Sequence, residues 1–281
     1  MSLQGQNVLI TGASMGIGRA IALAFAAEGA NLALLARSPD RLQRAKDECL
    51  EAAETGKHNS NVLFYQIDLQ DTAATGGVIS KAAKDLGINV ASGGAFDILI
   101  NNAGLALGAP KPFWEQDMTS EISPMIGTDI TGFMGVVHAM LNQGGMVKAK
   151  RGTIVNVTSV TGLEVPPFAG ETVYHSAKAC QEGFTNVLRT ELQQTNVRVL
   201  ALRPGVVQTN FHEQRVGYDK GQYDDFVGGM EALVAGDVAE AAVFMVKQPE
   251  RISVKALDVV PSSQRSLQVI DKTWEKRNAG A

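Results

Sequence analysis

The stretch of residues 7–24 constrains the fold more than any other part of the chain. It begins with an apolar run of strand length that ends at Thr11, and a glycine-rich turn with Gly12, Gly16 and Gly18 follows at once. An alanine-rich pattern with helical spacing comes next. A strand, a glycine turn and a helix in this order can cradle the pyrophosphate of a dinucleotide, because the glycines admit close approach and the helix N-terminus presents free N–H groups. The alternative is an ordinary glycine-rich turn between a strand and a helix.

Composition excludes several classes of protein. The chain has 281 residues, of which 45% are hydrophobic, so it is long enough for one large core. Its formal net charge of −4 gives no field that would attract nucleic acid or an anionic membrane, and we expect neither partner. Cys49 and Cys180 form no CxxC motif and the four histidines lack metal-ligand spacing, which predicts a reducing compartment and no metal. Because no segment has signal-peptide or membrane-spanning character, we expect a cytoplasmic location.

Strand-like apolar runs and helical patterns alternate along the whole chain. After the first strand and helix, further strands are predicted at residues 31–36, 62–67, 96–100, 152–158, 197–202 and 256–260. Helices are predicted at residues 39–55, 79–86, 122–147, 173–192 and 236–245. Near-continuous apolar strands that alternate with helices are typical of a parallel sheet covered on both faces, so the predicted fold class is α/β.

The chain shows no internal repeat, linker or low-complexity block. We therefore expect one domain over residues 1–271, followed by a flexible tail at 272–281. Residues 87–95 are rich in Gly, Ser and Asn, which predicts a surface insertion. Residues 209–234 follow the carboxyl end of a predicted strand and have no clear period, which makes them a candidate lid over a substrate.

Tyr174 and Lys178 lie four residues apart near the start of a predicted helix. This spacing places both side chains on one face, one turn apart. The ordinary tyrosine pKa of ~10 makes the phenol a poor acid–base catalyst at neutral pH, but a nearby ammonium stabilises the tyrosinate and lowers that pKa. Such a pair can exchange a proton with a carbonyl or an alcohol. The alternative is a solvated helix pair without a catalytic role, because this spacing is common by chance.

Five motifs occur in a fixed order along the chain. They are TGASMGIG at 11–18, NNAG at 101–104, a serine at the end of the fifth strand, YHSAK at 174–178 and PGVVQT at 204–209. In this order they resemble the short-chain dehydrogenase/reductase family over about residues 5–262. The resemblance implies a single Rossmann-type domain with a doubly wound, seven-stranded parallel β-sheet flanked by helices, and assembly as a homotetramer or homodimer.

The resemblance also implies roles for individual residues. Tyr174 would be the general acid in ketone reduction and the general base in alcohol oxidation, and Lys178 would hold the nicotinamide ribose. Ser159 would hydrogen-bond the substrate oxygen as charge develops on it. Besides Tyr174 and Lys178, the implied cofactor-binding residues are Gly12, Ser14, Met15, Gly16, Ile17, Gly18, Asp68, Leu69, Asn102, Ala103, Gly104, Pro204, Gly205, Val207 and Thr209.

Two positions depart from the family pattern. The family usually has a catalytic asparagine in the long helix, and alignment on Gly132 places Asp129 there. Buried near Lys178, this carboxylate is expected to be ionised and able to pair with the ammonium. The family spacing to the tyrosine points to Thr161 as the active-site hydroxyl, whereas the end of the fifth strand points to Ser159. We favour Ser159, because a strand end fixes the side chain while the following loop can lengthen.

The end of the second strand indicates the cofactor. An acidic residue there would bind the ribose 2′-hydroxyl of NAD, but Ala36 occupies this position and Arg37 and Ser38 follow. A small neutral residue admits a 2′-phosphate and arginine gives it a charge-assisted partner, so we predict NADP(H). The alternative is that Arg37 only points to solvent. Met15 is an opposing feature, since many NADP-binding relatives have a basic residue there.

The substrate is the least constrained part of the prediction. Segments 101–108 and 256–264 resemble the branch of serine, allo-threonine and 3-hydroxy-acid dehydrogenases. Arg215 falls where that branch has an arginine and could bind a substrate carboxylate, or it is a surface charge; Phe168 and Phe211 could line an apolar pocket or belong to the core. We therefore expect an NADP(H)-dependent oxidoreductase that interconverts a ketone and a secondary alcohol, with a small-molecule substrate such as a β-hydroxy acid. The alternatives are a reductase of a bulkier carbonyl in secondary metabolism and a catalytically silent NADP-binding regulator.

Overall fold

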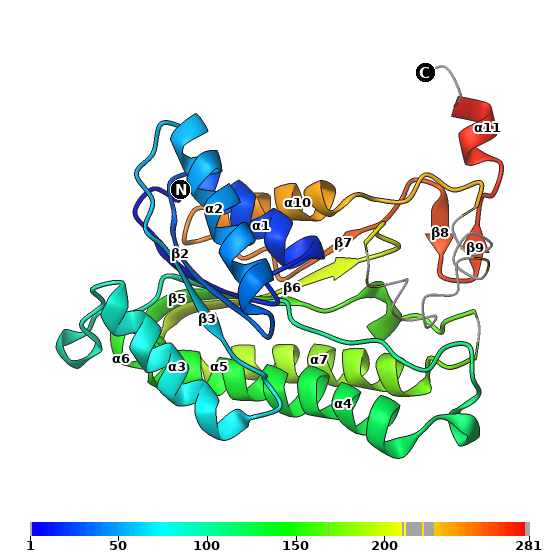
Figure 1. The fold of residues 1–281 in the computed structure, drawn as a ribbon, viewed down its shortest axis with the longest axis horizontal. Coiled ribbons are helices and arrows are strands. Elements are labelled where there is room, and N and C mark those ends of the chain that lie inside the picture. Colours follow the sequence, from blue (N-terminus) through cyan, green and yellow to red (C-terminus); the bar gives the residue numbers. More distant parts are fainter. Residues whose placement is uncertain (1, 168, 210, 212–220, 222–227, 279–281) are drawn as a thin grey trace.

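The computed structural model describes residues 2–167, 169–209, 211, 221 and 228–278. Seven parallel strands form one sheet in the order β3-β2-β1-β4-β5-β6-β7 (Figure 1). The strands are β1 (Asn7–Thr11), β2 (Asn31–Ala36), β3 (Val62–Gln66), β4 (Ile98–Asn101), β5 (Arg151–Val157), β6 (Asn196–Pro204) and β7 (Ala256–Val259). The strand order reverses between β1 and β4, and α/β sheets bind their ligands at such a switch point. The predicted α/β fold class and parallel sheet are confirmed.

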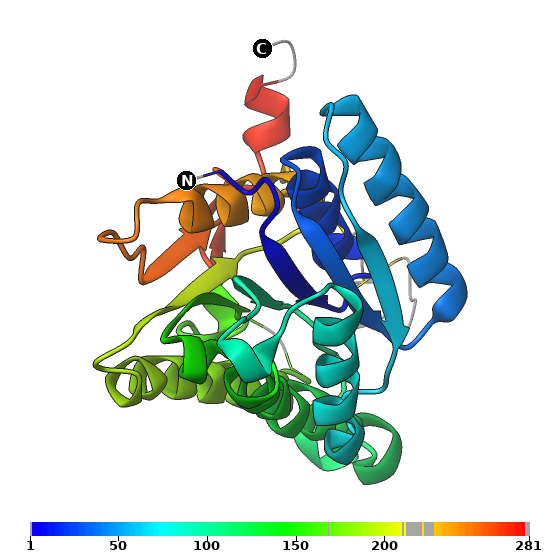
Figure 2. The ribbon, with the colours of Figure 1, turned by 90° about the vertical axis from the view of Figure 1, so that its left-hand side faces the viewer.

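Helices cover both faces of the sheet (Figures 1 and 2). One face carries α1 (Gly16–Ala27), α2 (Pro39–Thr55) and α10 (Ala235–Lys247). The other carries α3 (Thr72–Asp85), α5 (Phe133–Asn142) and α7 (Thr172–Glu191). Short helical turns at the connections are η1 (Val90–Ser92), η2 (Phe113–Glu115), α6 (Met146–Ala149) and η5 (Val160–Gly162). Within the described ranges, no helix is long and apolar enough to cross a membrane.

Successive residues of each strand point to opposite faces, and this alternation divides the core into two layers. Val8 and Ile10 of β1 pack into the cluster under α1, α2 and α10. Leu9, between them, packs into the cluster under α3, α5 and α7. Because both faces must be apolar, the strands are continuous apolar runs, and this explains why their positions could be predicted from the sequence.

The predicted helix over residues 122–147 is wrong at both ends. The helical segment begins at Met118, because the Asp117 carboxylate caps it by accepting the N–H group of Ser120 at 2.7 Å. It ends at Asn142, where the following glycine pair leaves the helical path and Gly145 adopts a φ of 85°. The glycine pair therefore stops the helix before residue 147.

This helical segment is also not a regular α-helix. Two of its parts, η3 (Met118–Ile122) and η4 (Gly127–Gly132), are π-helical and flank the short α4 (Ser123–Ile126). A Cβ on Gly132 would lie 2.7 Å from the carbonyl oxygen of Leu69, so the wide turn η4 packs directly on the loop after β3. π-helical turns are rare and occur frequently at functional sites.

Two other boundaries differ from the prediction. Helix α3 begins at Thr72 rather than near residue 79, because the Asp71 side chain caps it by accepting the Ala74 N–H at 3.0 Å. The expected surface insertion, residues 87–95, contains the turn η1 but ends in Ala95, which is buried. An Asx cap and a buried loop end are local features that apolar periodicity does not reveal.

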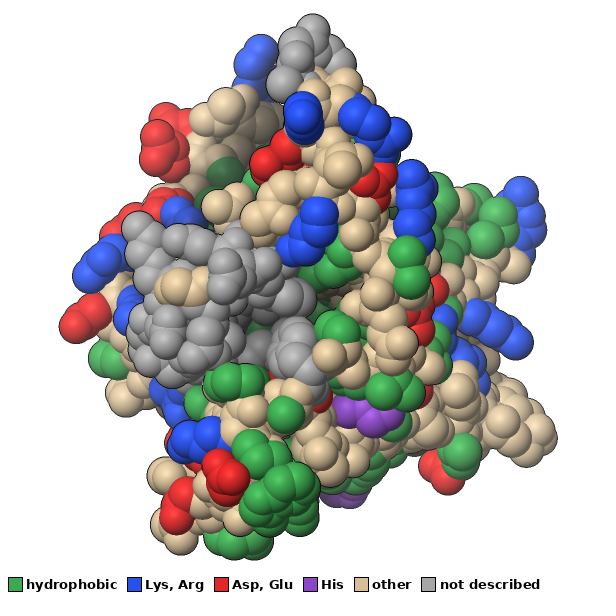
Figure 3. Space-filling model, turned by 90° about the vertical axis from the view of Figure 1, so that its right-hand side faces the viewer, with side chains coloured by type: hydrophobic (Ala, Val, Ile, Leu, Met, Phe, Trp, Pro, Cys, Tyr) green, Lys and Arg blue, Asp and Glu red, His purple; other side chains and the backbone are tan. Residues whose placement is uncertain are grey.

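Beyond β7 the chain forms a short hairpin that packs on the domain, and then a helix without buried residues that lies within the expected tail from residue 272. A hairpin of β8 (Gln264–Ser266) and β9 (Val269–Ile270) is followed by the helix α11 (Trp274–Asn278), at the right of Figure 1. Gln264 Oε1 accepts the N–H of Val206 at 3.1 Å, which fixes the loop after β6. Figure 3 shows this side of the molecule, where hydrophobic side chains adjoin the grey atoms. Most of the expected lid, residues 209–234, lies outside the described residues.

Candidate active site

The glycine-rich turn after β1 is held by the end of β4. Thr11 Oγ1 accepts the backbone N–H groups of Asn102 at 2.9 Å and Ala103 at 3.0 Å. The Asn102 side-chain amide donates in return to the Thr11 carbonyl at 3.0 Å. A Cβ on Gly18 would lie 2.4 Å from both the Gly12 carbonyl oxygen and the Asn102 amide nitrogen, so only glycine fits there. The N-terminus of α1 is thereby held at the switch point, where its free N–H groups suit an anion.

Basic side chains lie beyond the end of β2. Arg37 and Ser38 line a cleft here, and Arg41 in the first turn of α2 lines it with them. Arg41 Nη1 donates to Met15 Sδ at 3.4 Å, so it spans the gap between α1 and α2. Two guanidinium groups and a hydroxyl suit a phosphate dianion. Arg41 was not among the predicted site residues, although its place one turn into the helix after Ser38 was a usable signal.

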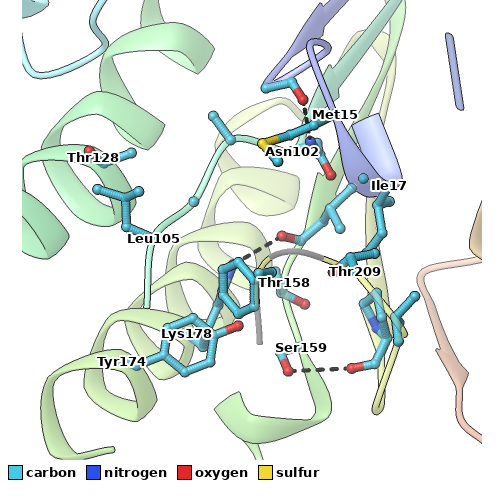
Figure 4. Close-up of a pocket in the computed structure, with 18 of the residues that line it drawn as sticks. Met15, Ile17, Asn102, Leu105, Thr128, Thr158, Ser159, Tyr174, Lys178 and Thr209 are labelled. Atoms are coloured by element: carbon cyan, nitrogen blue, oxygen red, sulfur yellow. Dashed lines mark hydrogen bonds between the residues drawn. The ribbon is translucent and has the colours of Figure 1, made fainter. Parts of the chain in front are cut away.

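The same cleft continues across the carboxyl ends of the strands, from β2 and β3 toward β5 and β6. The predicted cofactor residues that line it are Gly12, Ser14, Met15, Gly16, Ile17, Arg37, Ser38, Asp68, Leu69, Asn102, Ala103, Gly104, Tyr174, Lys178, Pro204, Gly205, Val207 and Thr209. Gly18 lies behind the loop and supports it from there. In Figure 4, Met15 and Asn102 lie at one end of the cleft and Ser159, Tyr174 and Lys178 at the other. One cleft therefore joins the phosphate-binding end to the candidate catalytic residues.

Three side chains converge at the catalytic end. Ser159 follows β5, donates from Oγ to the Pro204 carbonyl at 3.3 Å and accepts the Thr161 N–H at 3.1 Å. Its side chain also hydrogen-bonds Tyr174 on α7. The Lys178 ammonium lies 5.6 Å from the Tyr174 ring centroid, on the same face of α7. Thr161 lines the cleft as well, but the hydrogen bond to the phenol is made by Ser159.

Burial governs the protonation of Tyr174. Burial raises the pKa of Tyr174 above its ordinary value, the negative charge of Asp129 raises it further, and the Ser159 hydrogen bond lowers it. Burial also lowers the pKa of Lys178, whereas Asp129 and Glu182 raise it. The pKa of Tyr174 is raised overall and not lowered as expected, because desolvation outweighs any stabilisation of the tyrosinate by Lys178. The phenol is therefore protonated at neutral pH, which is the form that donates a proton.

Asp129 lies fully buried in η4 behind the cleft. Its Oδ1 accepts the Leu105 N–H at 2.8 Å, and its Oδ2 has no hydrogen-bond partner among the described residues. Burial raises the pKa of Asp129 to about 7, against the opposing effects of Lys178 and the Leu105 N–H. Lys178 donates elsewhere, to the Val157 carbonyl at 3.3 Å and to Gln181 Oε1 at 3.1 Å. The expected pairing of Asp129 with Lys178 is thus not seen as a hydrogen bond: the ammonium donates to Val157 and Gln181 instead, and burial disfavours the ionised form of the carboxyl.

The raised pKa of Asp129 makes folding stability depend on pH. In the unfolded chain this carboxyl ionises near pH ~4, so between pH ~4 and 7 the folded state binds more protons and stability falls as pH rises. We expect Asp129→Asn to remove this slope and to stabilise the protein at pH ~8 by up to about 4 kcal/mol relative to wild type. Urea unfolding of both proteins from pH ~5 to ~8 measures it. Parallel stability curves for the two proteins would contradict it.

The substrate end of the cleft is apolar over the described residues. Its lining there comprises Leu105, Val160, Pro166, Pro167, Phe211 and Leu267. The Phe211 ring centroid lies 5.6 Å from that of Tyr174. Leu267, in the turn of the β8–β9 hairpin, was missed because this short segment has no periodic pattern; its N–H donates to Glu164 Oε2 at 2.7 Å. The other two predicted substrate residues, Arg215 and Phe168, lie outside the described residues.

The described residues contain no group of three or more His, Cys, Asp or Glu side chains that could hold a metal ion. The seven-stranded sheet and the glycine turn at its switch point define a Rossmann-type fold. The chain belongs to the short chain dehydrogenase family, whose sequence model matches residues 6–217, and it is an oxidoreductase of that family. The predicted resemblance is therefore confirmed.

Individual relatives indicate to which branch of the family the chain is similar. The chain is 35% identical to a sulfoacetaldehyde reductase of Chromohalobacter salexigens over 92% of this chain and 94% of the relative. It is 33% identical to an NADP-dependent 3-hydroxy acid dehydrogenase of Schizosaccharomyces pombe over 93% of this chain and 95% of the relative. Among solved structures, the closed form of a serine dehydrogenase complexed with NADP+ matches with a TM-score of 0.81 at 31% identity, over 93% of this chain and 97% of that one. The 3-hydroxy acid dehydrogenase and the serine dehydrogenase confirm the predicted resemblance to that branch of the family.

Proposed function

We propose that the protein is an NADP(H)-dependent oxidoreductase that interconverts a ketone and a secondary alcohol, with a β-hydroxy acid or its ketone as the nearest substrate class. The observation that carries the proposal is the arrangement of one cleft. Its phosphate-binding end has Arg37, Ser38 and Arg41, and its other end has Ser159 and Tyr174 with Lys178 beside them. A 3-hydroxy acid dehydrogenase and a serine dehydrogenase among the relatives support the substrate class.

The residues of the cleft fit NADP(H). The glycine turn at the N-terminus of α1 is where the pyrophosphate would bind. Gly12 and Gly16 have φ angles of 64° and 56°, which favour glycine, and a Cβ on Gly12 would lie 2.9 Å from the Asn102 amide nitrogen. Arg37 and Arg41 would bind the 2′-phosphate, and the end of β2 carries no carboxylate; the carboxylate in the lining at this end is Asp68, which follows β3. The bound cofactor would supply or accept the hydride. The 3-hydroxy acid dehydrogenase is NADP-dependent and the serine dehydrogenase structure holds NADP+, which agrees with this choice.

The side chains of this protein would handle the proton and the developing charge. In the reductive direction the Tyr174 hydroxyl would donate its proton to the carbonyl oxygen of the substrate as the oxygen becomes negative. Ser159 Oγ–H would stabilise the same oxygen by a hydrogen bond, and this requires it to turn from the Pro204 carbonyl, which it now contacts at 3.3 Å. The positive charge of Lys178 would stabilise the tyrosinate that remains.

The test is a turnover assay with purified protein. Oxidation of NADPH and NADH is followed with a panel of β-keto esters, diketones and aryl ketones, and reduction of NADP+ with serine, allo-threonine and 3-hydroxybutyrate. Turnover that prefers NADPH and includes the hydroxy acids supports the proposal. If the wild type binds NADPH but converts no member of the panel, while Asp129→Asn does turn over, the silent NADP-binding regulator is the better description. If neither protein turns over, the panel lacks the substrate.

Arg37 and Arg41 should determine how strongly the protein prefers NADPH over NADH. We expect Arg37→Ala combined with Arg41→Ala to raise the KM for NADPH by about 100-fold or more, because each charge-assisted hydrogen bond contributes about 1.5 kcal/mol or more. The KM for NADH should change by less than about 3-fold, since that cofactor lacks the 2′-phosphate. Steady-state kinetics with both cofactors measure the two values. Arg44→Ala, on the same exposed surface of α2 but outside the cleft lining, is the control; an equal loss there would show a general charge effect instead.

A second candidate substrate class is a bulkier carbonyl compound. The described lining beside Tyr174 is apolar, with Leu105, Val160, Phe211 and Leu267 around the phenol. Such a surface buries a hydrocarbon group better than a carboxylate. In the same panel, aryl ketones with a higher kcat/KM than the β-keto and β-hydroxy acids would favour this class.

A further inference from the structure

Gln181 occupies an unusual place on α7. It lies one helical turn after Lys178, and its side chain is 1% exposed. Its amide nitrogen donates to the main-chain carbonyl of Asp129 at 2.8 Å, and its amide oxygen accepts from the Lys178 ammonium at 3.1 Å. A long amide is costly to bury unless both of its ends are satisfied, and here both are satisfied. This side chain therefore bridges η4 and the lysine.

The bridge fixes the direction of the amide. The Asp129 carbonyl can only accept a hydrogen bond, so the NH₂ group of Gln181 must face it. The amide oxygen then necessarily faces Lys178, whose ammonium can only donate. A second acceptor for the ammonium, the Val157 carbonyl at 3.3 Å, lies at the end of β5. The position of Nζ is thus set by two neutral oxygens, one from the sheet and one from α7.

A charged alternative partner is close to the ammonium. A Cβ on Gly104 would lie 3.5 Å from Asp129 Oδ1 and 3.6 Å from Lys178 Nζ, so both groups flank this glycine. Asp129 Oδ2 is buried without a hydrogen-bond partner among the described residues. Opposite charges attract strongly in a buried site, so without a competing contact the lysine would be drawn to this carboxylate. The other nearby carboxylate, Glu182, is already paired with Arg203 at 2.7 Å.

We propose that Gln181 is a positioning residue for the reaction: it holds the Lys178 ammonium beside Tyr174 and away from the Asp129 carboxylate. The inference rests on the proposed function for its catalytic consequence, but not for its geometry. A lysine captured by Asp129 would be drawn away from the phenol and would stabilise the tyrosinate less. An apolar residue at position 181 would allow this capture whenever Asp129 is ionised.

The test is a double-mutant cycle with Gln181→Met and Asp129→Asn. Met keeps the length and volume of Gln but removes both hydrogen bonds. We expect Gln181→Met to lower kcat by about 10-fold or more at pH ~8, where Asp129 is ionised, and clearly less at pH ~6, where it is protonated. In the Asp129→Asn background the same change should lower kcat by less than about 3-fold, because no carboxylate remains to capture the ammonium. An equal loss in both backgrounds overturns the proposal.

A matched variant separates positioning from structural support. Thr185→Val removes the buried hydrogen bonds of Thr185 with Asn156 and with the Gln181 carbonyl, one turn further along α7. It should lower the melting temperature, yet leave kcat and its pH profile unchanged. If Gln181→Met behaves in the same way, Gln181 is only structural. If Gln181→Met does not fold, Gln181→Leu replaces it in the same cycle with the same expected losses, and an equal loss in both backgrounds would again overturn the proposal.

The position of Lys178 Nζ can be measured without any turnover, so it tests this inference separately from the proposed function. The crystal structure of Gln181→Met at pH ~8 should show Lys178 Nζ hydrogen-bonded to Asp129, which in the present structure it is not. An unmoved Nζ overturns the proposal whether or not the wild type turns over any substrate. Conversely, a wild type that stays inactive where Asp129→Asn turns over refutes the proposed function, while the position of Nζ still decides the role of Gln181.

Discussion

Replacing Tyr174 by Phe should lower kcat by about 10²–10⁴-fold, because it removes the proposed general acid and little else. The phenol is buried and hydrogen-bonded to Ser159, and its ring packs beside Phe211. Phe keeps the ring and its packing, so the fold and the affinity for NADPH should change little. Turnover is measured with the best ketone of the panel, and NADPH affinity by the change in cofactor fluorescence on binding.

Tyr65→Phe is the matched control for this prediction. It removes another tyrosine hydroxyl, which donates to Asp85 at 2.9 Å and does not line the cleft. We expect full activity from this variant. If Tyr174→Phe also kept full activity, the proton would have to come from another hydroxyl, and Thr161 on the cleft wall would be the next to substitute.

Gly18→Ala should destabilise the protein by about 3 kcal/mol and abolish measurable cofactor binding. The added Cβ would lie 2.4 Å from the Gly12 carbonyl oxygen and from the Asn102 amide nitrogen, so the turn and the start of α1 must move apart. Forcing a methyl group into a packed site costs about 1–3 kcal/mol, and here a backbone oxygen is one of the two obstacles. Urea unfolding gives the stability, and NADPH titration gives the binding.

Two variants make this prediction specific. Asn102→Ala in the Gly18→Ala background removes the side-chain obstacle but not the Gly12 carbonyl, so it should not restore binding. Gly77→Ala places the same methyl group inside α3, where nothing lies within 4 Å, and should stabilise the protein by about 1 kcal/mol. NADPH binding that survives in Gly18→Ala would show that the turn does not hold the cofactor.

The sheet could be predicted from the sequence because its physics is local and repetitive. Strands such as β1 and β2 are buried on both faces, so each is a short apolar run whose ends are marked by polar residues or glycine. The glycine turn could also be predicted. A side chain at Gly18 would collide with the Gly12 carbonyl oxygen, so the turn requires glycine at a fixed position in the sequence. The family motifs then ordered these elements into one fold.

The helical segment before α5 could not be predicted in the same way. Its π-helical turn η4 depends on a contact between Gly132 and the Leu69 carbonyl, which are far apart in the sequence. Periodicity reports which residues face a core, but not whether a turn contains four or five residues. The early start at Met118 depends on one Asx cap at Asp117, which a polar loop does not make conspicuous.

The site residues that belong to sequence motifs could be predicted, whereas properties that depend on contacts between distant segments could not. Tyr174, Lys178 and Ser159 belong to short patterns, and the structure brings all three to one end of a cleft. The protonation of Asp129 depends on how deeply η4 buries it, and the bridge made by Gln181 depends on a contact with another helical segment. Neither property is present in a single stretch of sequence.

The hydrogen bond from the Val206 N–H to Gln264 has a consequence for biosynthesis. Strands β1 to β6 end at Pro204, far ahead of Gln264 in the chain, so they can leave the ribosome and pair before Gln264 does. The loop after β6, which walls the cleft at Gly205 and Val206, gains this contact only once Gln264 has left the ribosome. We therefore expect a nascent chain to form most of its sheet first and to complete the wall of the cleft afterwards.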